Sequence, residues 1–93
     1  MPAGPPERLY AAFGAALREL RNARGFSQEV LAQRAEINRV YLAEIETGRR
    51  NPTLYSIARI ASGLEVGLGD LLTLTDRLRE PEGSDSKGVG RAG

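Results

Sequence analysis

The chain has 93 residues, of which 41% are hydrophobic and 27% charged, and its formal net charge is +1. A chain of this length and composition suits one compact globular domain, and it contains no apolar run long enough to span a bilayer. It has neither cysteine nor histidine, which excludes disulfides and removes the usual ligands of zinc sites and the commonest catalytic nucleophile and base.

From these absences we expect a protein that is not an enzyme and that holds no metal or cofactor. The remaining carboxylates and serines form no recognisable set of nucleophile, base and orienting group. The first residues, Met1 to Pro6, lack the charged start and the apolar stretch of a secretory signal. We therefore expect a cytoplasmic protein with no membrane partner.

Charge is unevenly distributed along the chain. Nine arginines and five glutamates lie between Arg8 and Arg59, whereas the residues from Ile60 onward carry more acidic than basic side chains. A positive segment of this kind is expected where a protein meets phosphates. The first two thirds of the chain are therefore the candidate nucleic-acid-binding part.

The two ends of the chain have compositions that cannot build a core. Residues 1–6 are rich in proline, and residues 80–93 contain almost no apolar side chains. We expect both segments to be disordered and residues 7–79 to form one folded domain. Every strong pattern within that domain has apolar residues three and four apart, which predicts an all-α fold.

The first predicted helix spans about residues 7–23 and ends at Gly25. Its inward stripe consists of Leu9, Phe13, Leu17 and Leu20. A second helix of only about two turns follows Ser27, whose side chain is a good N-cap. The inward residues of this short helix are Leu31, Ala32 and Ala35.

A third helix is predicted to begin at Asn38, to point Leu42 and Ile45 inward and to stop at Gly48. Two short helices separated by three or four residues are typical of a helix-turn-helix, whose second helix enters the major groove of DNA. The sequence therefore predicts a DNA-binding motif with a recognition helix that starts at Asn38 and Arg39.

Two further helices complete the domain. The fourth is capped by Thr53, and its predicted apolar face consists of Leu54, Ile57, Ile60, Ala61 and Leu64. The fifth starts near Leu68, where Gly67 and Gly69 put its first turn in question, because each glycine costs up to ~1 kcal/mol of helix stability.

Four motifs carry a specific resemblance to a known family. They are Leu17-x-x-Leu20-Arg21, Gly25-Phe26-Ser27-Gln28-x-x-Leu31-Ala32, Ile45-Glu46-x-Gly48-x-x-x-Pro52 and Leu64-x-Val66. With these motifs the segment 17–72 resembles the Cro/phage-repressor family of helix-turn-helix regulators, also called the xenobiotic-response-element type. The segment from Asn38 to Pro52 also resembles the controller proteins of restriction-modification systems.

The resemblance implies a compact five-helix, lambda-repressor-like domain that acts as a homodimer on a roughly palindromic operator in double-stranded DNA. It also implies transcriptional control, by repression or activation, with RNA polymerase as a candidate further partner. In the family, the residues that match Arg21 and Glu46 form a partly buried ion pair between the first helix and the recognition helix. We expect the same structural pair here.

Base reading is predicted for the side of the recognition helix that faces away from Leu42 and Ile45. Arg39, in the first turn, can donate two hydrogen bonds to guanine, which is worth ~1–3 kcal/mol of discrimination. Val40 could contact a thymine methyl group or be an idle surface residue, and Glu44 could accept from cytosine or pair with a nearby arginine. The whole predicted reading face consists of Arg39, Val40, Ala43, Glu44 and Thr47.

Phosphate contacts are predicted at two places around the recognition helix. Free N–H groups at the start of the second helix attract a phosphate near Ser27 and Gln28, and in the family the matching glutamine contacts the DNA backbone. Next to the two ends of the recognition helix, the polar side chains suited to phosphate oxygens are those of Asn38, Tyr41, Arg49, Arg50 and Asn51.

The fifth helix carries more leucines than a domain this small is expected to bury. We expect the excess to form a homodimer interface, and the alternative is that these leucines only seal the base of the monomer. The leucines concerned are Leu68, Leu71, Leu72, Leu74 and Leu78.

An antitoxin that represses its own operon and also binds a toxin is the alternative function. The tail from Pro81 to Gly93 lacks the apolar anchors that a toxin-binding segment needs, which ranks this alternative below a dedicated regulator. A stoichiometric partner that copurifies with the chain would distinguish the two.

Overall fold

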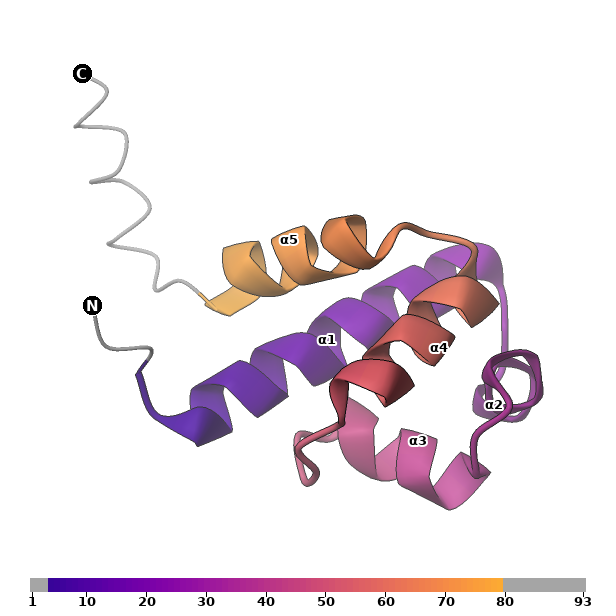
Figure 1. Ribbon diagram of the computed structural model, residues 1–93, viewed down its shortest axis with the longest axis horizontal. Helices are drawn as coiled ribbons and strands as arrows, with labels where there is room; N and C mark the ends of the chain where they lie inside the picture. Colours follow the sequence, from indigo (N-terminus) through magenta and orange to yellow (C-terminus); the bar gives the residue numbers. More distant parts are fainter. Residues whose placement is uncertain (1–3, 80–93) are drawn as a thin grey trace.

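Five helices and no strand build the part of the chain that the computed structural model describes, residues 4–79. In chain order they are α1 Pro6–Arg24, α2 Gln28–Ala35, α3 Arg39–Glu46, α4 Leu54–Leu64 and α5 Leu68–Arg79 (Figure 1). The predicted all-α, five-helix fold is confirmed. The expected disorder of residues 80–93 lies outside the described residues, as do residues 1–3.

Helices α2, α3 and α4 begin at the capping side chains that the sequence predicted. Ser27 accepts a hydrogen bond from the Val30 amide at 3.1 Å, and Asn38 Oδ1 accepts from the two amides that start α3, at 2.8 and 3.2 Å. Thr53 accepts from the Ser56 amide at 3.0 Å. These bonds satisfy backbone donors that have no partner inside a helix. The starts of these three helices are thereby fixed.

Helix α1 lies at the centre of the arrangement. Along its length α1 lies beside α5, while α3 crosses below it and α2 packs against α4 (Figure 1). The largest fully buried side chains are Leu17, Leu31, Leu42, Ile45, Ile60, Leu64 and Leu71, so every helix contributes to one core. Burying each such side chain contributes ~1.5–3 kcal/mol to folding. No helix within residues 4–79 is long and apolar enough to cross a membrane.

Three details of the predicted helices differ from the structure. Helix α1 starts at Pro6, inside the segment expected to be disordered, because proline fits a first helical position where its missing N–H has no partner. Leu54 was expected in the core but is 69% exposed, because it is the first residue of α4 and lies beyond the packed part of that helix. Leu9, in the first turn of α1, is 37% exposed and lies at the edge of its stripe.

Helix α5 begins at Leu68 despite its two glycines. The Leu71 amide donates to the Gly67 carbonyl at 3.1 Å, and Asp70 adds a negative charge in the first turn, where the positive end of the helix dipole favours it. The leucines of α5 do not form one exposed stripe. Leu71 is fully buried in the core of its own chain, so the prediction that it belongs to a dimer interface is wrong.

The other leucines lie on two flanks of α5. Leu68 and Leu72 are four residues apart and share one side, whereas Leu74 and Leu78 share another. Leu68 and Leu74 are half-buried, and Leu72 and Leu78 are more exposed. A single partner surface cannot use both flanks equally.

Gly14 allows α1 to pass directly against the end of α3. A Cβ atom at this position would lie 2.5 Å from the carbonyl oxygens of both Ile45 and Glu46, which no real side chain tolerates. Gly48, just beyond α3, has φ 77° and a close neighbour as well, since a Cβ there would lie 3.1 Å from the Cα of Ala11. The closeness of α1 and α3 therefore depends on glycine on both sides.

We predict that Gly14→Ala destabilises the fold by about 3 kcal/mol, because the added methyl group forces backbone apart at a packed contact. The matched control is Gly69→Ala in α5, where a Cβ meets nothing within 4 Å. This control should stabilise the fold by about 0.5–1 kcal/mol, since alanine is the better helix former. Urea unfolding of both variants measures the two effects, and a Gly14→Ala variant as stable as wild type would contradict the close contact.

Candidate nucleic-acid interface

Helix α3 buries one side and presents the other to solvent. Leu42 and Ile45 are almost completely buried, which fixes the rotation of α3 on the domain. The outward side forms a shallow groove of about 350 Å³ lined by Arg39, Val40, Ala43, Glu44, Thr47 and Arg49. The structure thus brings all five residues of the predicted reading face together, with Arg49 beside them.

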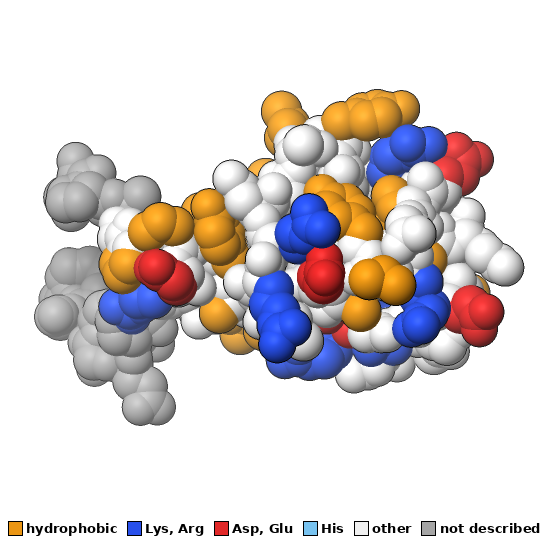
Figure 2. All heavy atoms as spheres, turned by 90° about the horizontal axis from the view of Figure 1, so that it is seen from below, with side chains coloured by type: hydrophobic (Ala, Val, Ile, Leu, Met, Phe, Trp, Pro, Cys, Tyr) orange, Lys and Arg blue, Asp and Glu red, His pale blue; other side chains and the backbone are white. Residues whose placement is uncertain are grey.

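This outward face is rich in arginine. Figure 2, which views the molecule from the side on which α3 lies, shows blue arginine side chains around a red acidic side chain, with apolar side chains between them. Arg39 and Arg49 are exposed and form no side-chain hydrogen bond or ion pair with another described residue. Val40 is 56% exposed. These side chains are available to a ligand.

Arg50 differs from its neighbouring arginines because it already has partners. Its Nε donates to Glu44 Oε1 at 2.7 Å, and its guanidinium carbon lies 5.4 Å from the centre of the Tyr41 ring. The Tyr41 hydroxyl in turn donates to Ser56 Oγ of α4 at 3.3 Å. Of the two interpretations of Glu44, pairing with a nearby arginine is the one that the structure contains.

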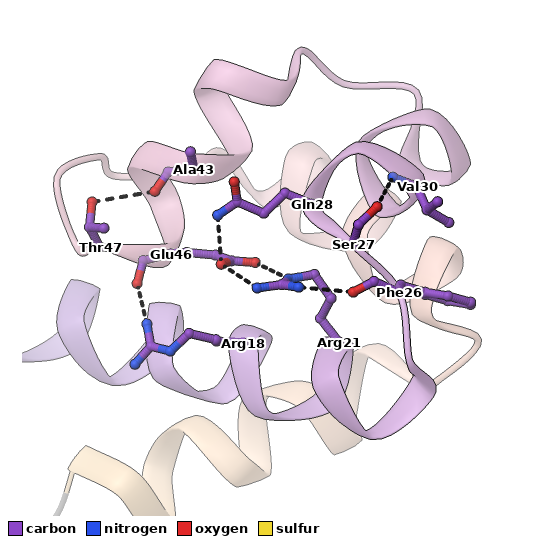
Figure 3. Close-up of polar contacts among 9 residues, drawn as sticks. All are labelled: Arg18, Arg21, Phe26, Ser27, Gln28, Val30, Ala43, Glu46 and Thr47. Carbon is purple, nitrogen blue, oxygen red and sulfur yellow. Dashed lines mark hydrogen bonds and ion pairs between the residues drawn. The ribbon is translucent and has the colours of Figure 1, made fainter.

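A buried polar cluster under α3 joins three helices (Figure 3). Arg21 of α1 donates from Nε and NH2 to the two carboxylate oxygens of Glu46, at 2.6 and 3.0 Å, and from NH1 to the Phe26 carbonyl at 2.8 Å. The side chains of Arg21 and Glu46 are only 13% and 2% exposed. This is a bidentate, charge-assisted contact, the strong type of protein hydrogen bond.

Gln28 belongs to the same cluster. Its Nε2 donates to Glu46 Oε1 at 3.0 Å, so the first residue of α2 is tied to the last residue of α3. Its side chain is therefore not a free donor, although the amide keeps a second hydrogen and its oxygen. Arg18 completes the cluster by donating from NH1 to the Glu46 carbonyl at 2.9 Å.

Sequence reasoning missed Gly14, Arg18 and the bond from Gln28 to Glu46. A signal for two of them was present, because Gly14, Arg18 and Arg21 follow one another at spacings of four and three residues. Such residues share one side of a helix. A small residue and two arginines on one side of α1 indicate a polar contact with another element instead of water alone.

Comparison with protein families gives one match over most of the domain. The model of the family described as a helix-turn-helix domain matches residues 12–74. This range contains all of the α2–α3 pair and the residues of the buried cluster.

Individual relatives point the same way. An HTH-type transcriptional regulator of Sinorhizobium fredii is 36% identical over 63 residues, covering 68% of this chain and 82% of the relative. The restriction-modification controller protein C.AhdI from Aeromonas hydrophila is 40% identical in sequence to this chain. Its crystal structure matches with a TM-score of 0.66 over 67% of this chain and 94% of that one. The controller protein C.Esp1396I, solved as a tetramer with its natural 35-base-pair operator, is 28% identical, with a TM-score of 0.72 over 76% and 93% of the two chains.

We predict that Glu46→Gln destabilises the domain by about 3–5 kcal/mol, because it leaves the charge of Arg21 partly buried without its partner. The matched control is Glu36→Gln, which alters the ion pair of Glu36 with Arg59, where the glutamate side chain is 76% exposed. That change should cost less than about 1 kcal/mol. Chemical unfolding measures the free energy of unfolding of both variants. Equal losses of stability would show that the buried pair contributes no more than the exposed one.

Proposed function

The chain belongs to the helix-turn-helix family of DNA-binding transcriptional regulators, and from this membership we propose that it binds a specific operator as a homodimer. The observation that carries the proposal is the exposed side of α3, where Arg39 and its neighbours line a groove while Leu42 and Ile45 hold the helix in place. An unpartnered arginine in the first turn of a helix is suited to reading the major groove.

Within this proposal the residues of the outward face divide into two groups. Arg39 reads guanine through its planar fork, and Val40 contacts a thymine methyl group. The phosphate backbone is held on both sides of the groove, by the free amides at the start of α2 and by the polar loop after α3. The residues assigned to phosphate are Ser27, Gln28, Tyr41, Arg49, Arg50 and Asn51.

The proposed dimer uses the flank of α5 that carries Leu68 and Leu72. On this side an apolar pocket of about 120 Å³ lies between α1, α4, α5 and the loop after α3, and Leu9, Pro52, Ile57 and Leu72 are among its lining residues. Leu9 and Leu72 are 37% and 38% exposed, so the rim of the pocket is apolar as well. A second copy of the chain is the occupant that a symmetric regulator supplies.

This flank also suits the geometry of DNA. It adjoins Asn51 and Pro52 of the loop that follows α3, so a two-fold pairing there brings these loops of the two copies close to the interface. The operator is then roughly palindromic, with half-sites about 10 base pairs apart or a small multiple. The operator complex of the tetrameric C.Esp1396I supports an oligomer on DNA, and the identity to C.AhdI supports a role as a restriction-modification controller.

We predict that Arg39→Ala costs ~1–3 kcal/mol of binding to the best sequence selected from a random DNA library and relaxes the preference at one base position. Binding to mixed-sequence DNA should change little, because phosphates and not bases supply that affinity. Fluorescence anisotropy with both DNAs provides the comparison. Equal losses on the two would place Arg39 on the backbone instead of a base.

We predict that Leu72→Glu weakens the dimer at least tenfold, because a carboxylate at the pocket rim loses its hydration when a partner covers it. Leu78→Glu is the matched control, since Leu78 is similarly exposed but lines a different depression, with Ala11, Ala12 and Ala15. Sedimentation equilibrium measures both. A wild type that stays monomeric at high concentration, or a Leu78→Glu variant that alone dissociates, would contradict this interface.

A further inference from the structure

Among the arginines of the outward face, Arg50 is the one whose guanidinium is already held. Its Nε edge is bonded to Glu44, at 2.7 Å, and its plane lies near the Tyr41 ring. Glu44 and Tyr41 are three residues apart on α3 and so share one side of that helix. Arg50 comes from the loop after α3, and the two contacts clamp that loop residue back onto the helix.

The clamp leaves the other edge of the guanidinium open. Neither terminal nitrogen of Arg50 makes a hydrogen bond with another residue in the described part of the chain, and the side chain is 54% exposed. A guanidinium carries its donors in a fixed fork, so fixing the Nε edge also fixes the direction of the terminal N–H groups. Those groups are the ones that suit two phosphate oxygens.

A negative side chain such as Glu44 lowers the affinity of a DNA-binding face for DNA. Glu44 lines the same groove as Arg39 and Arg49, and a negative charge there repels phosphates. The Tyr41 end of the clamp is anchored to α4 through Ser56, whose amide is itself capped by Thr53. The clamp is therefore supported by α4 as well as α3, and Glu44 provides its hydrogen bond to Arg50.

We propose that Glu44 is a positioning residue, which holds the Arg50 guanidinium with its terminal edge ready for a backbone phosphate of the operator. The inference rests on the proposed function and deepens it at that same site. Glu44 lowers affinity for any DNA through its charge, but it raises affinity for the operator through orientation, because only the register fixed by base contacts places a phosphate opposite the held edge of Arg50. A pre-ordered side chain does not lose its rotamer freedom on binding. Glu44 thus increases the preference for the operator over other DNA in two ways, by its charge and by the orientation of Arg50.

Two substitutions separate orientation from charge. Glu44→Ala removes both the clamp and the negative charge. Operator affinity should fall by about two- to tenfold, because Arg50 then loses rotamer freedom when it binds. The fall is expected although the protein becomes more positive. Binding to a short mixed-sequence duplex should rise about twofold, because a repulsive charge is gone. Glu44→Gln keeps an acceptor for Nε and should restore operator affinity while still binding mixed-sequence DNA more tightly.

The control for net charge is Glu19→Ala, which removes an exposed carboxylate of α1 that has no ion pair within residues 4–79. It should raise affinity for both DNAs slightly and equally. Circular dichroism confirms that each variant is folded. If Glu44→Ala strengthens binding to operator and mixed-sequence DNA alike, Glu44 acts only through its charge and the proposal is overturned.

A nuclear magnetic resonance measurement tests the clamp without an operator. The Nε–Hε signal of Arg50 should exchange slowly with water in the free wild type and in Glu44→Gln, and rapidly in Glu44→Ala. An Arg50 signal that Glu44→Ala leaves unchanged would overturn the proposal. Failure of a random library to yield any preferred sequence would count against the proposed function, whereas the Arg50 signal would still decide whether Glu44 holds this side chain.

Discussion

Glu46 joins three helices at one point, through its carboxylate and its carbonyl. The carboxylate receives two hydrogen bonds from Arg21 of α1 and one from Gln28 of α2, and the carbonyl receives one from Arg18. The same carbonyl lies so close to Gly14 that α1 has no room for a side chain there. The position of α3 relative to α1 and α2 therefore depends on polar contacts at its last residue, in addition to the apolar core.

These contacts explain how a short helix can be held in one fixed position. An isolated helix of eight residues is not stable in water, so α3 needs tertiary contacts at both ends. Its start is capped by Asn38, its middle is buried through Leu42 and Ile45, and its end is held by the Glu46 cluster. Among residues 4–79 no buried side-chain nitrogen or oxygen lacks a hydrogen-bond partner. The cluster therefore fixes the orientation of α3 without leaving a buried polar group unsatisfied. The outward side chains of α3 therefore have no part in holding the helix in place.

Much of this arrangement could be predicted from the sequence, because the signals are local. The caps Ser27, Asn38 and Thr53 mark the starts of three helices, and the spacing of Leu42 and Ile45 defines which side of α3 faces out. Spacing along α1 indicates a polar contact on the side of Gly14, but it does not name the partner, and nothing local indicates the bond from Gln28 to Glu46. Leu71 of α5 was assigned to the dimer interface for the same reason: spacing shows which residues share a side of a helix but not which side the core occupies, and the core covers Leu71.

The proposed function requires that the outward side of α3 is the surface that meets DNA. Backbone amide shifts of isotope-labelled protein, followed during titration with the selected operator duplex, test this directly. We expect the largest changes in the first turns of α2 and α3 and in the loop that follows α3, with α1 and the Leu78 flank of α5 little affected. Changes concentrated on α5 or on the exposed side of α4, with the amides around Arg39 unmoved, would contradict it.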